Sequence, residues 1–296
     1  DSPDYVYVGD YLSPKMMIIF EEGYKRIHGV QGIDWDGDGN IDNPNFPTGY
    51  KAFYVMKYEA TQGQYVDFLN SLTSNQISSS SLYPNVQFND HTIFYQNQEY
   101  VCQHPDRSCS GFTSNFGDED YRLLSFADFM GLRPLTEFEF EKSARGPLNS
   151  VYLENAWGNT ASVLLSSISG QENGTETPIP QNANVGNGAF RVGIFANEST
   201  NRVSSGSSYF GVMDLSGNLF EGLIKDFRFQ DNNGDGELSS NGSADSFFLK
   251  EANSIFPFYQ YSNQWGRFTL ISPRAMPGWI NIQGCARFVR NAPILP

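Results

Sequence analysis

The stretch from Gly131 to Gly146 constrains the fold more than any other segment, because it specifies both ends of one helix. Thr136 and Glu139 have the spacing of a capping box, in which each side chain accepts a hydrogen bond from the other residue's backbone N–H. Pro134 keeps the residue before it extended, and the closing glycine ends the helix. The sequence therefore predicts one short helix that starts at a defined residue and ends sharply.

A second segment repeats this arrangement earlier in the chain. Residues 53–59 (FYVMKYE) read as a β-strand, and Thr61 with Gln64 forms another capping box directly after it. The residues that follow place apolar side chains on one helical face, at Tyr65, Phe68, Leu69 and Leu72. A strand that leads into a capped amphipathic helix is the prediction.

Residues 131–146 resemble the G-x-R-L-P-T-E-x-E-W-E-x-A-A-R-G signature of the formylglycine-generating-enzyme (sulfatase-modifying factor) family. Further blocks similar to that family occur, in order, at residues 53–68, 155–160, 182–186, 208–221 and 285–290. The resemblance implies an α+β, C-type-lectin-like fold that is rich in loops, with few short helices and mostly antiparallel strands. Many members with this fold are not enzymes, so the resemblance alone leaves the activity open.

The blocks suggest how the chain is organised. We expect residues 1–50 to form an N-terminal extension with strands within 5–30, and residues 51–296 to form the family-like domain. An insertion at about 73–120 is expected to carry a hairpin over residues 86–100. Finer expectations are a short helix over 126–130 capped by Ser125, and a loop over 165–181.

Composition excludes several classes of function. With 39% hydrophobic residues, 296 residues are enough for a full-size core. The net charge of −14 argues against binding nucleic acid or anionic membranes, both of which need a basic surface. The sequence contains no run of 18 apolar residues, so it predicts no membrane-spanning helix. Because the first residues are polar, we expect a cytoplasmic chain or a mature form without its signal, and the Asp-rich loops favour a secreted or cell-surface protein.

The most specific chemical motif is an Asp-rich loop in the N-terminal extension. Its oxygen ligands recur at alternate positions: Asp34, Asp36, Asp38, Asn40 and Asp42. Calcium binds such hard oxygen ligands, and the glycine at position six allows the sharp turn that lets them converge. Position twelve is Asn45 rather than glutamate, so the loop resembles those of extracellular modules. The alternative is a solvated acidic turn.

Other residues are weaker metal candidates. A second loop offers Asp231, Asn233, Asp235 and Glu237, but a plain Asn/Gly turn explains it equally well. Family enzymes also carry structural calcium, and by resemblance the matching positions are Asn184, the carbonyl of Val185, and Asn218. Turn and cap formation is the alternative role of these residues. Calcium is therefore the expected cofactor, in a structural role.

The family's catalytic ligands are not found in this sequence. By resemblance, the oxygen-dependent enzymes bind copper between two cysteines near the C-terminus, whereas residues 256–283 contain no cysteine and Cys285 stands alone. The iron-dependent branch uses a His-x-x-x-His-x-Glu motif, and the histidines at 28, 91 and 104 lack that spacing. We therefore expect neither copper nor iron, and the sequence favours a non-catalytic protein over an enzyme.

Two further features concern partners and redox state. Cys102 and Cys109 flank a polar loop and could close a small disulfide, if the loop geometry allows it. The C-terminal part carries a set of aromatic and basic residues that could bind a protein or glycan, or belong to the core: Tyr259, Tyr261, Trp265, Arg267 and Trp279.

These observations predict a secreted or cell-surface, calcium-stabilised binding or assembly protein on a lectin-like scaffold. Its partner would be a protein or glycan at the C-terminal aromatic face, and it could form a homo-oligomer or a surface assembly. Two alternatives remain open. One is a structural subunit of a surface fibre or layer, and the other is an enzyme of unknown, oxidoreductase-like chemistry on the same scaffold.

Overall fold

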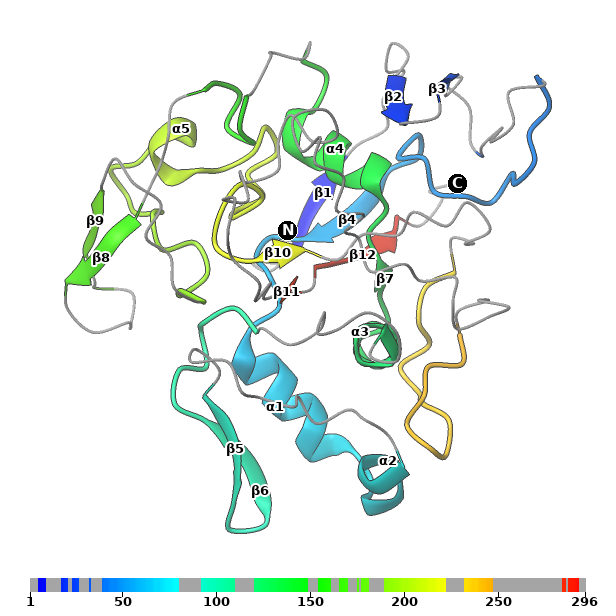
Figure 1. The fold of residues 1–296 in the computed structure, drawn as a ribbon, viewed down its shortest axis with the longest axis vertical. Coiled ribbons are helices and arrows are strands. Elements are labelled where there is room, and N and C mark those ends of the chain that lie inside the picture. Colours follow the sequence, from blue (N-terminus) through cyan, green and yellow to red (C-terminus); the bar gives the residue numbers. More distant parts are fainter. Residues whose placement is uncertain are drawn as a thin grey trace.

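In a computed structural model, a four-stranded antiparallel sheet contains one strand from near the start of the chain and one from near its end (Figure 1). Its strand order is β1 (Tyr5–Val8), β4 (Phe53–Met56), β12 (Phe288–Asn291) and β7 (Arg133–Pro134). The N-terminal strand therefore extends the same sheet that the last strand joins. Alternating apolar positions within 5–30 correctly predicted strands there.

The structure describes residues 5–8, 17–20, 23–26, 32, 39–79, 92–109, 120–148, 154–160, 165–169, 175, 177–180, 189–221, 232–246, 284–285 and 287–292. The helices are α1 (Gln62–Ser71), α2 (Ser74–Ser79), α3 (Asp120–Phe129), α4 (Glu137–Arg145) and α5 (Arg202–Ser205). Four small two-stranded sheets pair β2 (Met17–Phe20) with β3 (Gly23–Arg26), β5 (Ile93–Gln96) with β6 (Glu99–Cys102), β8 (Leu165–Ser169) with β9 (Thr177–Pro180), and β10 (Phe220–Glu221) with β11 (Gly284–Cys285).

The central sheet divides the core into two layers, because successive side chains of a strand point to opposite faces. Phe288 packs with α1 and α3 in an aromatic cluster, where its ring lies 5.6 Å from that of Phe126. Its neighbour Val289 packs with Val55 and the α4 residue Phe140 in the other layer. In Figure 1, α4 lies on one side of the sheet and α1 and α3 on the other.

Both predicted capping boxes are present. Thr136 Oγ1 accepts a hydrogen bond from Glu139 N at 3.3 Å, and Glu139 Oε2 accepts one from Thr136 N at 3.2 Å. Thr61 and Gln64 make the same reciprocal pair at the start of α1. Gly146 ends α4 with φ +63°, a conformation that side chains rarely adopt. These helix boundaries were correctly predicted, apart from the loss of Leu72 from the last turn of α1.

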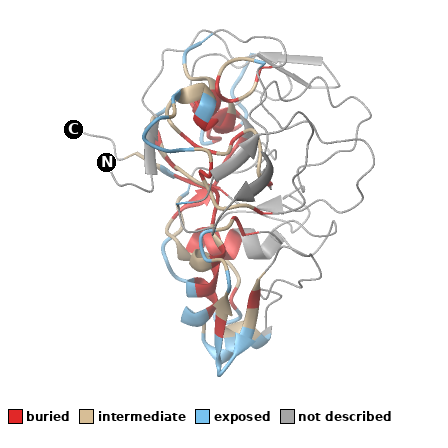
Figure 2. Cartoon of the chain, turned by 90° about the vertical axis from the view of Figure 1, so that its left-hand side faces the viewer, coloured by how far each residue is buried: buried red, intermediate tan, exposed pale blue. Residues whose placement is uncertain are grey.

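The β5–β6 hairpin lies at the far end of the molecule, where exposed residues gather (Figure 2). Asn97 and Gln98 form its turn, both with positive φ as a two-residue hairpin turn of type I′ requires. Asn70 of α1 completes the outer edge of β6: its amide accepts from Tyr100 N at 2.8 Å and donates to Tyr100 O at 2.9 Å. The described hairpin runs from Ile93 to Cys102, two residues beyond the end of the predicted 86–100, and residues 80–91 lie outside the described part.

Two finer expectations were wrong. Ser125 lies inside α3 and does not cap it, because the helix begins five residues earlier at Asp120. Residues 165–181 contain the β8–β9 hairpin in place of a loop, since backbone pairing alone holds together strands with little apolar alternation. The architecture is α+β, with few short helices and mostly antiparallel strands. None of the described helices has the length and hydropathy to cross a membrane.

Candidate functional site

A buried acidic centre forms where the start of α1, the turn before β10 and the start of β12 meet. Glu59 lies between β4 and α1 and is completely buried. Its Oε2 accepts hydrogen bonds from Ser108 Oγ and from Asn218 Nδ2 (2.6 Å), and its Oε1 accepts from Leu219 N at 3.2 Å. A carboxylate far from solvent is thereby tied to two other segments of the chain, one at Ser108 and one at Asn218 and Leu219.

The turn that faces Glu59 contributes two more carboxylates. Asp214 and Asn218 both have positive φ, at +63° and +55°, so the backbone of the D-L-S-G-N segment is tightly folded. Asp214 Oδ2 accepts from Gly193 N at 2.6 Å. Glu221 follows in β10, where its backbone pairs in parallel with Cys285 of β11. The turn therefore directs acidic groups toward the same buried region.

Arg287 supplies the principal positive charge of the centre. Its Nε lies 2.7 Å from Glu221 Oε1, and its terminal nitrogens donate to the carbonyls of Met56 (2.9 Å) and Met213 (2.8 Å). The guanidinium is completely buried, immediately before β12. It consequently connects β4, the turn before β10 and β12 in one network.

Electrostatics in this centre favour protonation or a cation. Burial, followed by the charges of Asp214 and Glu221, raises the pKa of Glu59 well above its usual range, and Arg287 only partly opposes this. Burial also raises the pKa of Asp214 and of Glu221. Although burial lowers the pKa of Arg287, its acidic neighbours raise it overall. Negative charge in this region exceeds what Arg287 neutralises.

One oxygen in the centre has no hydrogen-bond partner. The Glu221 side chain is only 5% exposed, and its Oε2 atom is buried without a donor among the described residues. An unpartnered buried carboxylate oxygen is costly, because desolvation is not offset by a hydrogen bond. Hard divalent cations such as calcium bind carboxylate and carbonyl oxygens of this kind. Among the described residues, however, the acidic side chains whose ligand atoms lie close enough to share one ion are Asp128, Asp235 and Asp245, and Glu59, Asp214 and Glu221 do not form such a group.

A second acidic cluster lies between α3 and residues 232–246. The carboxylates of Asp128, Asp235 and Asp245 lie within 4.8 Å of one another, and Asp128 is buried. Asp128 also accepts hydrogen bonds from Asp235 N at 3.1 Å and Asp245 N at 2.9 Å. This loop is the second calcium candidate from the sequence, but Asn233 points elsewhere: its Oδ1 accepts from Asn291 N at 3.0 Å.

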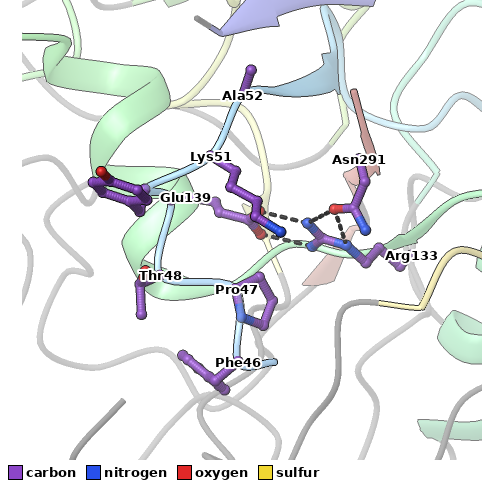
Figure 3. Close-up of a pocket in the computed structure, with 10 residues that line it drawn as sticks. Phe46, Pro47, Thr48, Lys51, Ala52, Arg133, Glu139 and Asn291 are labelled. Atoms are coloured by element: carbon purple, nitrogen blue, oxygen red, sulfur yellow. Dashed lines mark hydrogen bonds and ion pairs between the residues drawn. The ribbon is translucent and has the colours of Figure 1, made fainter. Parts of the chain in front are cut away.

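A small pocket beside α4 shows what the signature motif does in the fold (Figure 3). The pocket is partly open to solvent and is lined by residues 46–52, Arg133, Glu139 and Asn291. Arg133 donates two hydrogen bonds to the Glu139 carboxylate at 2.6 and 2.8 Å, and two to Asn291 Oδ1 at 2.7 and 3.2 Å. These charged groups join α4 to β7 and β12, and they are held within the chain.

Comparison with protein families agrees with this arrangement. A model of the family described as the sulfatase-modifying factor enzyme 1-like domain matches residues 13–256, which is most of the chain. The chain belongs to this family. A comparison with curated proteins finds no match. The resemblance inferred from the signature at 131–146 is thereby confirmed.

Among the family-like sequence motifs, the structure brings Asn218 into the buried centre, where its amide donates to Glu59 and Ser108. Asn184 and Val185 lie outside the described residues. Of the Asp34–Asp42 loop, only Asn40 and Asp42 among the named ligands are described, and both are exposed. Gly32 lies against Ile41 and Pro44, so the ends of that loop meet.

The remaining predictions fall partly outside the described structure. Asp231 and the C-terminal residues Tyr259, Tyr261, Trp265, Arg267 and Trp279 are not described. In the structure, no disulfide joins Cys102 to Cys109, the pair whose bridging the sequence left open. Cys102 ends β6, whereas Cys109 lies in the core and its N–H donates to Ala60 O at 2.7 Å. The two cysteines thus belong to separately anchored segments.

Sequence reasoning missed most of the buried centre. Glu59, Asp214, Glu221 and Arg287 were read only as members of family-like blocks, with no chemical role. A usable signal was present, since charged residues adjacent to buried strands and turns are rarely left without a partner. Nothing in their spacing indicated that residues up to 228 positions apart, Glu59 and Arg287, would act in one network.

Proposed function

We propose that this protein is a secreted or cell-surface binding or assembly protein whose lectin-like scaffold is stabilised by calcium, and that it is not a catalyst. The observation that carries the proposal is the Asp128–Asp235–Asp245 cluster, whose carboxylate oxygens lie within 4.8 Å of one another. Three carboxylates this close stabilise a fold best when a cation lies among them.

Charge supports a divalent ion at this cluster. The three carboxylates lie within 4.8 Å of one another, and Asp128 is buried, so their negative charges repel one another. The backbone N–H groups of Asp235, Asp245 and Ser246 donate to Asp128 and offset part of this repulsion. One calcium ion would supply the missing positive charge, and carboxylate oxygens are ligands of its preferred kind.

The non-catalytic part rests on chemistry rather than geometry. The chain has three cysteines, and Cys285 is the one cysteine beyond residue 109, so a cysteine pair for copper is not available near the C-terminus. Signature residues such as Arg133 and Glu139 are occupied in holding the fold. A scaffold that keeps its structural residues without the metal ligands of catalysis is suited to binding. The direct check is an oxygen-consumption assay with copper and a cysteine-containing peptide, in which turnover would overturn this part.

Thermal unfolding in chelator and in 10 mM calcium tests the cation. For a Kd of about 10⁻⁴ to 10⁻³ M, typical of extracellular sites, the ion stabilises the fold by about 1.4–2.7 kcal/mol. With an unfolding entropy of about 2.1 cal/mol/K per residue, the melting temperature of a chain this long should rise by about 2–4 °C. An unchanged melting temperature would refute calcium stabilisation.

Three variants assign the effect to one of the candidate sites. Asp235→Asn keeps the shape but removes one charge of the Asp128 cluster, so we expect it to abolish most of the calcium shift. Glu221→Gln tests the buried centre around Glu59, and Asp36→Asn tests the N-terminal loop. A shift that persists in Asp235→Asn but disappears in either other variant would move the site. Light scattering in both buffers separates a monomeric binder from a calcium-dependent assembly.

A further inference from the structure

Arg202 differs from the buried arginines of the described structure because it forms no ion pair with a glutamate there. Arg133, Arg145 and Arg287 each form an ion pair with at least one glutamate. Arg202 contacts only the Ala156 carbonyl, at 3.0 Å from Nη2, and the ring of Tyr209, 5.7 Å from its Cζ, among the described residues. Although the chain carries a net charge of −14, no ion pair joins this guanidinium to a carboxylate of the described residues.

The guanidinium is nevertheless held in a defined place. Gly158 has φ +87°, and a Cβ atom there would lie 3.1 Å from Nη2 and 3.4 Å from both Cζ and Nη1 of Arg202. Such similar distances mean that the glycine backbone lies against the flat face of the guanidinium. The Ala156 carbonyl fixes its edge. Because the position is set before any ligand arrives, less entropy is lost on binding.

Tyr209 forms the second part of the site. Its ring is 42% exposed, yet its backbone N–H donates to Ala144 O at 3.0 Å. The ring packs against Gly146, where a Cβ atom would lie only 2.4 Å from Cδ1, and edge-to-face against Phe210 with centroids 5.1 Å apart. The surface therefore combines a fixed aromatic ring and a cation.

The hydrogen-bonding capacity of Arg202 is largely unfilled. A guanidinium carries five N–H donors, and within the described structure one nitrogen has an acceptor. Nε is buried with no partner. Burial lowers the pKa of this guanidinium below its ordinary value, and Tyr209 opposes the effect. The Arg202 guanidinium has therefore lost contact with water without gaining an anionic partner among the described residues. Such a partly exposed cation favours the binding of an anion.

We propose that Arg202 and Tyr209 form a binding site for an acidic saccharide, whose carboxylate accepts two N–H bonds from Arg202 while the sugar ring packs against Tyr209. Paired N–H groups match a carboxylate in geometry, and an exposed tyrosine offers apolar surface with a polar tip. Peptides that bind as an added strand or a helix need a sheet edge or an apolar groove, and acidic peptide motifs are held by clusters of arginines, whereas here one arginine and one tyrosine stand on a short helix and a turn. The inference rests on the binding role proposed above, but at a surface separate from the acidic centre.

Calorimetric titration of the full chain with a 1,4-linked uronic acid tetrasaccharide tests the site. The matched ligands are a neutral hexose tetrasaccharide and an acidic tetrapeptide. We expect the uronate to bind, and Arg202→Gln to weaken its affinity at least tenfold. Arg202→Lys, which keeps the charge but loses the paired donors, should give an intermediate loss. Arg290→Gln removes an exposed arginine of β12 and should leave the affinity unchanged.

Several results would overturn the proposal: no uronate binding, equal binding of the neutral sugar, binding of the peptide alone, or unchanged affinity in Arg202→Gln. Tyr209→Ser keeps Arg202 and should also weaken binding, which guards against a variant that fails only by unfolding. The calcium-dependent shift in melting temperature, measured on the same samples, separates the two proposals. Arg202→Gln should retain that shift, and its absence in the wild type would refute calcium stabilisation while leaving the saccharide result to stand on its own.

Discussion

Replacing Arg133 with methionine is the sharpest test of how the signature motif holds the fold. Arg133 and Glu139 are 1% and 2% exposed, and the pair is joined by two hydrogen bonds of 2.6 and 2.8 Å. Methionine fills much of the volume but leaves the Glu139 carboxylate buried without its cation. It also removes both hydrogen bonds to Asn291, which tie β7 to the end of β12.

The magnitude follows from this burial. Breaking a buried pair by removing one partner costs about 3–5 kcal/mol, mostly because the other charge is left uncompensated. At an unfolding entropy of about 2.1 cal/mol/K per residue, a chain of this length should melt about 5–8 °C lower. Urea unfolding followed by circular dichroism measures the free energy, provided that the slope with denaturant is unchanged.

Two further variants make the reasoning refutable. Arg290→Met replaces an exposed arginine one residue before Asn291 and should change stability by less than about 0.5 kcal/mol. Adding Glu139→Gln to Arg133→Met removes the unpaired charge while keeping an acceptor for the Thr136 N–H, so it should restore part of the loss. A cost below about 1 kcal/mol for Arg133→Met, or a double variant no more stable than the single one, would contradict this account.

The remaining predictions concern pH and backbone strain. Because the folded-state pKa values of Glu59, Asp214 and Glu221 are raised, the free energy of unfolding in calcium-free buffer should fall as pH rises from about 4.5 through those values. When the free energy of unfolding is measured with urea at several pH values, it should fall less steeply with pH in Glu221→Gln than in the wild type. An identical dependence on pH in the two proteins would contradict the raised pKa of Glu221. Gly146→Ala should destabilise by about 1–3 kcal/mol, since φ is +63° and Cβ would meet Tyr209. Gly211→Ala, with open space at φ +87°, should cost less in the same melts.

Local features of the fold were open to prediction because their contacts lie within a few residues. The capping boxes at Thr61 and Thr136 need only partners three positions away, and both occur as expected. The start of α3 was misplaced because Ser125 resembles a cap, although burial within the helix decides its role. The β8–β9 hairpin was missed because polar strands carry little periodicity.

Residues of the candidate sites depend on contacts that no spacing reveals. Asp128 meets Asp235 across 107 positions, although the sequence placed Asp235 only within a loop of its own. Arg202 reaches Ala156 across 46 positions, and neither residue was assigned a role. Contacts between residues this far apart in sequence can be identified only in the folded structure, where their segments lie side by side.

By itself, the sequence determined the family, the α+β class and the ends of the two capped helices, because these follow from ordered blocks and short-range hydrogen bonds. Only the tertiary structure decided that Glu59, Asp214 and Glu221 share one buried region with Arg287, and that Arg202 pairs with a carbonyl and not with a carboxylate of the described residues. The physical reason is that desolvation and Coulomb interactions depend on distance in space and on burial, and neither quantity is encoded in the separation along the chain.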